Sequence, residues 1–316
     1  MTSCRTLTQL LLAGTIALAS PARAAGVTVH DARSRDVTVA DFARTVSIGG
    51  AITEILYALG LESRLVGVDT TSLYPAAALN DKPNVGYMRQ ISAEGVLGLN
   101  PTLILAIQGS GPRETMDLLE TAKVPLVLVP ETFSEDGLIE KIKLVGHAMG
   151  VDARAECLST AVGADLAQLR ALRARVTKPV RVMFVMSLQN GRAMVAGHKT
   201  AADEIIQLAG AANAVDDYDG YKIIGDEAIV AAKPDVVLSI ERGRDSLQAD
   251  AVYAHPGFAL TPVAANKSFI TMDGLYLLGF GPRTAAAARD LSVKLYPALA
   301  EGGAFKSALS AANCRQ

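Results

Sequence analysis

One short loop holds the side chains best suited to bind a metal: Val85-Gly86-Tyr87-Met88-Arg89-Gln90. The phenolate oxygen of Tyr87 would be a hard anionic donor for ferric iron, and tyrosine is an accepted axial ligand of haem iron. A free phenol titrates near pH ~10, so it is ionised at neutral pH only beside a metal or a cation. Arg89 is close enough in sequence to supply that cation. The residue types alone favour a plainer alternative, a half-buried tyrosine hydrogen-bonded to the backbone, because isolated tyrosines seldom bind metal.

The residues around this loop predict how it is held. Gly86 permits a backbone conformation that a residue with a Cβ would resist. Ser92 is a suitable N-cap for a helix running towards Pro101. Binding residues commonly lie on loops presented by a rigid scaffold, so this loop is a candidate binding site.

Alternating strand and helix patterns on both sides of the loop predict an α/β lobe. Residues 44–48 form a β-prone run, Gly49-Gly50 is a tight turn, and 51–60 is an amphipathic helix closed by glycine. Strands and helices then alternate as far as residue 129, which predicts right-handed βαβ units and a parallel sheet. Residues 26–44 lack a clear period, so we expect a lead-in with one edge strand at most.

The pattern changes after Pro130. Residues 134–149 and 152–176 are both predicted to be helical, and apolar residues recur along the second piece at three- and four-residue spacing. We interpret the second piece as a rigid strut between two lobes. The predicted division is therefore a first α/β lobe at 26–148, a linking helix at 149–177 and a second α/β lobe at 178–316.

The second lobe repeats features of the first. Gly220-Tyr221 is followed by a helical and then a strand pattern, as Gly86-Tyr87 is, and residues 203–210 resemble residues 53–60. Two similar lobes joined by a strut create a cleft, and clefts between domains are favoured ligand sites.

Composition limits the class of protein. The chain has 316 residues, long enough for two domains, with 50% hydrophobic and 20% charged residues, as in ordinary soluble globular proteins. Its formal net charge of −2 argues against a nucleic-acid partner.

The first 25 residues read as a secretory signal peptide. Arg5 precedes a short apolar run, and Ala22-Arg23-Ala24 supplies small residues around a cleavage site. Cys4 lies before the apolar run, so it cannot be a lipidated cysteine at the cleavage point. Cys157 and Cys314 remain, and they could pair in an oxidising compartment or stay free, since spacing gives no geometric test.

The familiar enzymatic motifs are absent from the sequence: there is no P-loop, dinucleotide-binding glycine motif, nucleophile elbow or His-Glu-x-x-His. The four histidines are scattered without the spacing of a zinc site. His198 is the best of them as a cleft residue, and the glycine at 197 would let backbone approach a flat ligand. Surface or packing roles for the histidines, and an ordinary turn at Gly197, are the alternatives.

Read together, several segments closely resemble the haem-binding periplasmic proteins of bacterial haem ABC importers. The resemblance covers about residues 45–299, and the Gly-Tyr-x-Arg loop is its most specific part. The other segments are Ser47-Ile48-Gly49-Gly50-Ala51-Ile52-Thr53-Glu54-Ile55, Met194-Val195-Ala196-Gly197, Thr200-Ala201-Ala202-Asp203 and Leu277-Leu278-Gly279-Phe280-Gly281-Pro282-Arg283.

This resemblance implies an α/β fold of the class III periplasmic binding protein type, with two similar lobes, mainly parallel sheets, one long bridging helix and little hinge motion. Ferric haem would lie in the cleft as the transported ligand, with Tyr87 as its iron ligand and Arg89 as the stabilising cation. Some members of the family use a histidine from the second lobe as well. Residues 186–191 contain none here, so a second ligand and the number of haems stay open.

Other residues are candidates to contact the porphyrin. Methionines adapt to flat apolar ligands, although each is also a common core residue, the role we favour for Met186 at the end of a buried strand. Tyr221 and Lys222 repeat the ligand loop in the second lobe and are expected to meet a propionate or the second haem face. The expected ligand-binding set beside Tyr87 is Arg89, Met88, Gly86, Met194, Gly197, His198, Tyr221, Lys222 and Arg242.

Related binding proteins dock on their permease through one acidic residue on each lobe. That resemblance points to Glu114 in the first lobe and to Glu241 or Asp245 in the second. Without it, these would read as solvated charges, each worth only ~0 to 1 kcal/mol in an exposed pair.

The sequence thus predicts a periplasmic carrier, not an enzyme, that delivers ferric haem to an inner-membrane ABC permease with its ATPase; a monomer is expected. The nearest alternative is the same scaffold carrying a ferric siderophore or a cobalamin. Those ligands need aromatic or arginine contacts, which a chain with 5% aromatics and no tryptophan supplies sparingly. An exported haem-dependent enzyme would need a proton-transfer group beside the iron, and the loop from Gly86 to Ser92 offers no histidine or carboxylate.

Overall fold

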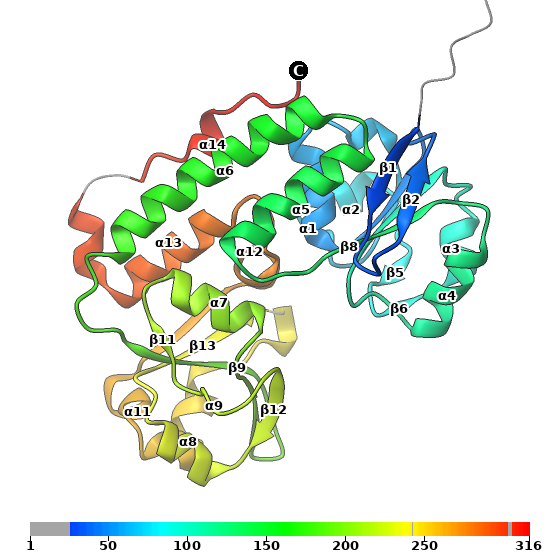
Figure 1. The fold of residues 1–316 in the computed structure, drawn as a ribbon. Helices are drawn as coiled ribbons and strands as arrows, with labels where there is room; N and C mark the ends of the chain where they lie inside the picture. The colour runs from blue at the N-terminus through cyan, green and yellow to red at the C-terminus, as the bar shows by residue number, and fades with distance from the viewer. Residues whose placement is uncertain (1–25, 242, 303–304) are drawn as a thin grey trace, which may run out of the picture.

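The computed structural model describes residues 26–241, 243–302 and 305–316, which form two α/β lobes joined by helices (Figure 1). The predicted signal peptide at 1–25 lies outside the described residues. None of the helices in the described part of the chain is both long and apolar enough to cross a bilayer.

The first lobe contains a four-stranded parallel sheet in the order β4-β3-β7-β8. The core on one face includes α1 and α5, and the core on the other includes α3 and α4, so β3, β7 and β8 are buried throughout. The strands are β3 (Thr45–Ile48), β4 (Leu65–Val68), β7 (Leu103–Ile107) and β8 (Leu126–Val129), and the short pair β5 (Gly86–Tyr87) and β6 (Gln90–Ile91) lies apart from them. The helices are α1 (Gly50–Ala58), η1 (Glu62–Arg64), α2 (Ala77–Asp81), α3 (Ala93–Leu97) and α4 (Arg113–Thr121).

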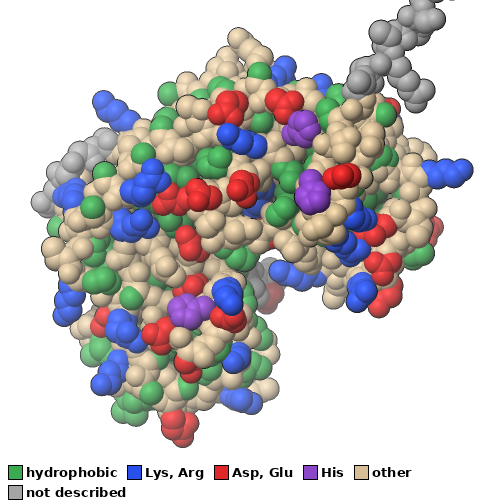
Figure 2. Space-filling view, viewed as in Figure 1, with side chains coloured by type: hydrophobic (Ala, Val, Ile, Leu, Met, Phe, Trp, Pro, Cys, Tyr) green, Lys and Arg blue, Asp and Glu red, His purple; other side chains and the backbone are tan. Residues whose placement is uncertain are grey.

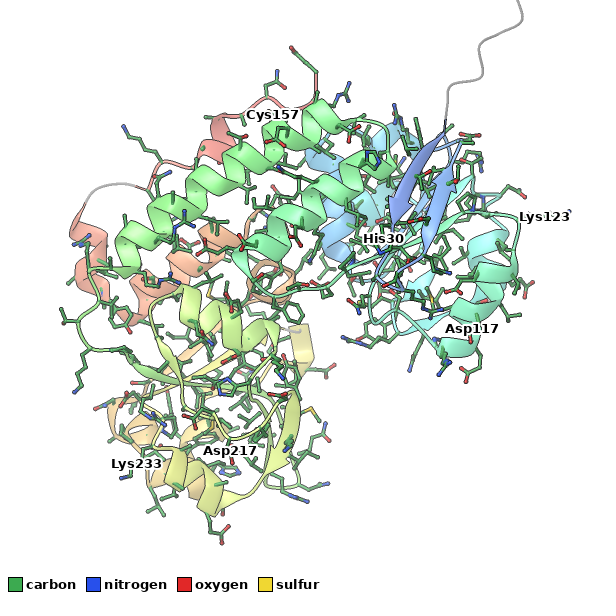
Figure 3. The ribbon with its side chains drawn as sticks, viewed as in Figure 1. His30, Asp117, Lys123, Cys157, Asp217 and Lys233 are labelled. Atoms are coloured by element: carbon green, nitrogen blue, oxygen red, sulfur yellow. A yellow bond between two sulfur atoms is a disulfide. The ribbon has the colours of Figure 1, made fainter. Side chains whose placement is uncertain are left out.

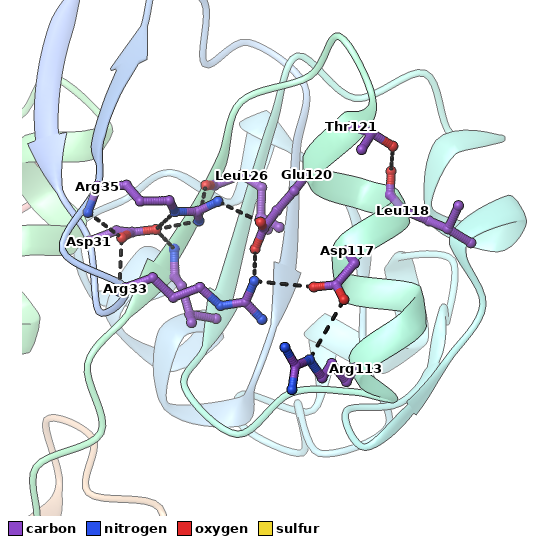
Figure 4. A network of polar contacts seen from close by, with 10 residues as sticks. Asp31, Arg33, Arg35, Arg113, Asp117, Leu118, Glu120, Thr121 and Leu126 are labelled. Atoms are coloured by element: carbon purple, nitrogen blue, oxygen red, sulfur yellow. Dashed lines mark hydrogen bonds and ion pairs between the residues drawn. The ribbon is translucent and has the colours of Figure 1, made fainter.

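The lead-in segment differs from the expectation of one edge strand at most. It forms an antiparallel hairpin of β1 (Val27–His30) and β2 (Asp36–Val39). Asp31 is buried in its turn, and burial opposes ionisation. Hydrogen bonds from Arg35 and Arg33 outweigh that effect and hold the pKa of Asp31 below its usual value. Both arginines also form ion pairs with Glu120 on α4, fastening the hairpin to the lobe (Figure 4).

Two antiparallel helices link the lobes: α5 (Glu135–Ala148) and α6 (Asp152–Arg173). Gly150 turns the chain between them with a positive φ of 67°. The helices can approach closely because Gly146 has no Cβ; one built there would lie 2.2 Å from the Cβ of Ala155. The helix predicted to reach residue 176 ends at Arg173.

The sheet of the second lobe is mixed. β13 pairs in parallel with β9 and β14, whereas β10 is antiparallel to β9 and β12. Asn190 and Gly191, both at positive φ, make the tight turn that reverses β9 into β10. The strands are β9 (Arg181–Gln189), β10 (Arg192–Ala196), β11 (Ala212–Asn213), β12 (Tyr221–Ile224), β13 (Val236–Glu241) and β14 (Phe269–Asp273). The helices are α7 (Ala201–Leu208), α8 (Asp226–Ala232), η2 (Gly243–Asp245), α9 (Ala249–Tyr253), α10 (Pro256–Ala259), α11 (Pro262–Asn266), α12 (Gly274–Leu278), α13 (Thr284–Leu295), η3 (Pro297–Gly302) and α14 (Ala308–Ala311).

The C-terminal tail runs back along α6 towards the first lobe. Asp165 on α6 accepts hydrogen bonds from Ser307 Oγ and the Ala308 amide at 2.7 and 2.6 Å. A disulfide joins Cys157 on α6 to Cys314, which answers the question that spacing left open (Figure 3). Beyond it, Arg315 forms an ion pair with Glu62 of the first lobe.

Candidate functional site

A deep hollow separates the lobes on the face shown in Figure 2. Figure 1 shows the β5–β6 loop on the first-lobe side of this gap and the edge strand β12 on the second-lobe side. The two Gly-Tyr dipeptides identified in the sequence therefore lie on opposite sides of the cleft, because β5 holds Tyr87 and β12 holds Tyr221.

The tyrosine loop of the first lobe is a small hairpin with a fixed backbone. Gly86 adopts a φ of 99°, which a residue with a Cβ would resist, and its amide donates to Asn84 Oδ1 at 2.8 Å. The Gly111 amide donates to the Met88 carbonyl at 2.9 Å, and the Ile91 amide donates to the Gly111 carbonyl at 3.0 Å. Hydrogen bonds from Gly111 of a neighbouring loop thus hold the hairpin at its turn and on β6.

The helix after the loop begins as predicted. Ser92 is the N-cap of α3, and its side chain accepts a hydrogen bond from the Gly95 amide. This cap and the buried side chains of Ile91 and Val96 anchor the C-terminal side of the hairpin.

Tyr87 and Arg89 are in direct contact at the tip of this hairpin. Arg89 Nη1 donates a hydrogen bond of 2.7 Å to the phenol oxygen of Tyr87, and the guanidinium carbon lies 6.0 Å from the ring centroid. Tyr87 keeps 38% of its surface exposed. The positive charge of Arg89 thus lies beside the oxygen that would bind ferric iron.

A buried charged pair lies behind this loop. Lys141 on α5 is fully buried, and its Nζ donates to Glu131 Oε1 at 2.5 Å and to the Phe280 carbonyl at 3.2 Å. Burial raises the pKa of Glu131 above its usual value, although the charges of Lys141 and Arg89 oppose the rise. Lys141 therefore joins Glu131 to the C-terminal part of the chain.

The wall of the second lobe is apolar. Side chains alternate along a strand, so Tyr221 and Ile223 lie on the same face of the sheet. The ring of Tyr221 lies edge-on to that of Phe184, with centroids 6.4 Å apart. Met194 is opposite Ile223 in the β10–β12 pairing and is half-buried. Tyr221 and Ile223 are 40% and 50% exposed, so this end of the sheet presents apolar surface to solvent.

Lys222 and Gly197, both expected to contact a ligand in the cleft, lie against Tyr218 instead. The ammonium of Lys222 lies 4.5 Å over the ring of Tyr218, on the sheet face opposite Tyr221, so these two adjacent residues do not share a surface. Gly197 is buried, and a Cβ there would lie 2.2 Å from the Tyr218 carbonyl oxygen. The backbone of Tyr218 is thus a sufficient reason for glycine at 197, and contact with a ligand stays a prediction.

His198 is held by an acidic neighbour. Its Nδ1 lies 3.2 Å from Asp203 Oδ2, and this hydrogen bond raises the pKa of the imidazole above its usual value. Asp203 also accepts from Asn213 Nδ2 at 3.0 Å. The contact orients His198, which stays partly exposed.

The remaining predicted residues fall in several places. Arg242 lies outside the described residues. Met186 does not end its strand as expected but lies within β9, half-buried, because the strand continues to Gln189. Glu114 is exposed in the first turn of α4, and Glu241 and Asp245 are exposed at the end of β13 and in η2.

Sequence reasoning missed a cluster that joins the lobes. Glu54 on α1 binds Arg283 through both carboxylate oxygens, at 3.0 and 2.9 Å. The Arg283 guanidinium stacks on Tyr74 at 3.5 Å from the ring centroid and lies 5.1 Å from that of Tyr276. Glu54 and Arg283 lie in two of the segments that carried the resemblance, but a pairing across 229 residues leaves no local signal.

A separate pocket of about 290 Å³ opens on the second lobe among Arg181, Asp216, Asp217, Tyr218 and the helix α8. Figure 3 shows Asp217 at the far end of this lobe, away from the cleft. The guanidinium of Arg181 already donates to the carbonyls of Ala214 and Ala232. Two exposed carboxylates at the rim disfavour an anionic ligand such as haem. Among the described residues, no three His, Cys, Asp or Glu side chains are grouped to hold a metal ion.

Comparison with known sequences finds matches over most of the chain. The sequence profile of periplasmic binding proteins matches residues 46–276. The uncharacterised ABC transporter substrate-binding lipoprotein YvrC of Bacillus subtilis is 27% identical over 275 residues, 86% of each chain. Several cobalamin-binding and vitamin B12-binding proteins also match, at 23–28% identity.

Solved structures are more similar still. The periplasmic heme-binding protein RhuT from Roseiflexus sp. RS-1, in apo form, is 40% identical, with a TM-score of 0.77 over 82% of this chain and 100% of that one. The periplasmic heme-binding protein BhuT in complex with two hemes is 39% identical, with a TM-score of 0.77 over 81% and 98%. These matches confirm the expected α/β fold class.

Proposed function

The chain belongs to the periplasmic binding protein family, as the resemblance implied, and from that premise we propose that it binds ferric haem in the cleft between its lobes and delivers it to an inner-membrane ABC permease. Haem is the cargo here, not a catalytic cofactor. The family is a class of substrate-binding proteins, which fits a carrier better than an enzyme.

The hydrogen bond from Arg89 to Tyr87 is the observation that carries this proposal. It joins an exposed phenol to a permanent cation at 2.7 Å on a backbone that neighbouring loops hold in place. A ferric porphyrin needs one axial ligand of this kind, and a single iron–oxygen bond is easier to break at handover than two. The solved structures with 40% and 39% identity are named as heme-binding proteins, which supports the same ligand.

The apolar wall of the second lobe supports the proposal independently. A porphyrin is flat and apolar apart from its propionates, and Tyr221, Ile223 and Met194 present surface of that character. The exposed guanidinium of Arg89 is a charged partner for a propionate.

Cobalamin and ferric siderophores are the alternatives, and cobalamin is favoured by the names of several curated relatives. Those relatives are less similar than the solved heme-binding structures, at no more than 28% against 39–40% identity. An exposed phenol hydrogen-bonded to an arginine suits a ligand whose metal has an open axial position. Haemin offers such a position.

The proposal is tested by titrating the protein without residues 1–25 with haemin, cobalamin and a ferric siderophore, and recording absorption spectra. We expect saturable binding of haemin with the spectrum of a ferric tyrosinate haem. Tyr87→Phe should lose that spectrum, whereas Tyr253→Phe, which changes a tyrosine on α9, should keep it. Saturation by cobalamin or the siderophore with no response to haemin would overturn the proposal.

Location and partners follow from the same reading. We propose export to the periplasm through the predicted signal peptide, action as a monomer, and docking on the permease and its ATPase through Glu114 on one lobe and Glu241 or Asp245 on the other. Their exposure on both lobes supports this role. Charge reversal at Glu114 should slow haem transfer to the permease in membranes while leaving haemin binding in solution unchanged.

A further inference from the structure

Exposed apolar side chains gather around the cleft. Seven large hydrophobic residues are exposed among the described residues. Tyr87 and two residues of β12 flank the hollow, and Leu118 and Leu260 lie on other helices or turns. The remaining two, Leu73 and Tyr74, are adjacent in the loop after β4 and are 52% and 45% exposed.

This loop is joined directly to the tyrosine hairpin. The Thr70 amide donates to the Gly86 carbonyl at 2.9 Å, one residue before Tyr87. Asp69 is fully buried and accepts hydrogen bonds from the Gly49 amide at 2.9 Å and the Thr71 amide at 3.0 Å. These hydrogen bonds tie the start of the loop to the tyrosine hairpin and fix the backbone that leads to Leu73 and Tyr74.

The other side of the loop is fixed by the C-terminal part of the chain. The Arg283 guanidinium stacks on the ring of Tyr74. The same guanidinium donates hydrogen bonds to both carboxylate oxygens of Glu54. A Cβ on Gly50 would meet both the Thr71 carbonyl and Leu275 of α12, so these segments are in close contact. The loop thus lies where the two lobes meet.

We propose that Leu73 and Tyr74 form a ledge that contacts the apolar edge of the porphyrin ring, with Arg283 as the residue that positions Tyr74. The inference rests on the proposed function and names the part of the ligand that this surface takes. The ledge takes the apolar edge and not a propionate, because Glu54 already pairs with the nearest cation. A rigid apolar surface there fixes how far the ring enters the cleft, and therefore where iron meets Tyr87.

The test uses two probes, haemin and iron-free protoporphyrin IX, because only haemin can bond to Tyr87. Leu73→Ser should weaken both by about five- to tenfold, since it removes a half-exposed leucine from the contact with the ring. Bound haemin should keep its ferric tyrosinate spectrum in this variant. Leu118→Ser, a matched change at a leucine exposed on α4, should leave both affinities unchanged.

Each outcome is informative. Leu73→Ser protein that binds both probes as tightly as the unmodified chain overturns the ledge and leaves the haem carrier intact. Failure of the unmodified chain to bind haemin overturns the carrier, and the ledge with it. If Leu73→Ser does not fold, Leu73→Ala supplies the same comparison with an expected loss of about threefold.

Discussion

Arg89 Nη1 donates a hydrogen bond of 2.7 Å to the phenol oxygen of Tyr87, two residues away across the tip of the β5–β6 hairpin. This contact gives the first prediction. Arg89→Gln keeps a donor but removes the positive charge beside the oxygen that would bind iron, so haemin affinity should fall by about tenfold.

The control for this change is Arg113→Gln, which removes an exposed arginine from the start of α4. It should leave the haemin affinity unchanged. Haemin titrations at pH 7 measure both variants. Equal affinity of Arg89→Gln and the unmodified protein would mean that iron binding by Tyr87 does not need this cation.

The fold was predictable where sequence signals are local. The strand–helix rhythm from β3 to β8, the cap at Ser92 and the long helix α6 all follow from residues close together in the chain. The β1–β2 hairpin was missed because its strands are four residues long and its buried aspartate is balanced by arginines in the same turn. The mixed sheet of the second lobe depends on a tight turn at Asn190 and Gly191 that the β-prone runs did not reveal.

The candidate site, like the fold, was predictable only where its residues are close together in the sequence. Tyr87 and Arg89 are two positions apart, so residue types and spacing were enough to predict their pairing. Glu54 and Arg283 are 229 positions apart, and their pairing depends on how the lobes meet. No periodicity records such a contact, which is why this junction between the lobes emerged only from the structure.

The buried pair of Lys141 and Glu131 gives a second prediction. Lys141→Met leaves a largely buried carboxylate without its partner, which should lower the free energy of unfolding by about 3 kcal/mol at pH 7. Burial raises the pKa of Glu131 in the folded state, so the folded protein takes up a proton more readily than the unfolded chain. The deficit of the variant should therefore shrink as the pH falls from 7 to 5.

Urea unfolding at both pH values measures this effect. The double variant Lys141→Met/Glu131→Gln removes the unpaired charge and should recover much of the lost stability at pH 7. A single variant whose deficit does not change with pH would contradict an electrostatic origin and indicate lost packing instead.

The disulfide between Cys157 and Cys314 gives a third prediction. It closes a loop with a sequence separation of 157 residues and holds the tail near the first lobe, where Arg315 pairs with Glu62. Cys314→Ser should lower the free energy of unfolding by about 2–4 kcal/mol. The unmodified protein in dithiothreitol should match the variant.

Thermal unfolding with and without reductant measures this effect, and the variant itself should not respond to reductant. Figure 3 places Cys157 on α6, on the outer side of the molecule from the cleft. Haemin affinity should therefore be unchanged in Cys314→Ser. A large loss of affinity would show that the tail controls the spacing of the lobes.

His198 and Asp203 give the last prediction. The hydrogen bond from the imidazole to the carboxylate raises the pKa of His198 in the folded protein above the ordinary value of ~6.5. A raised pKa means that the stabilisation is fully present below the unfolded value and is lost as the pH rises through the folded one. Because His198 is partly exposed, the effect should stay below ~1 kcal/mol.

The free energy of unfolding of the unmodified protein should thus exceed that of His198→Gln by more at pH 6 than at pH 8.5. Urea unfolding of both proteins across this range checks the sign, and a difference that grows with pH would contradict it. The same variant separates two roles for this residue. If His198 only stabilises the turn before α7, haemin binding survives its replacement. A changed haemin spectrum in His198→Gln would mean that the imidazole reaches the ligand from the second lobe.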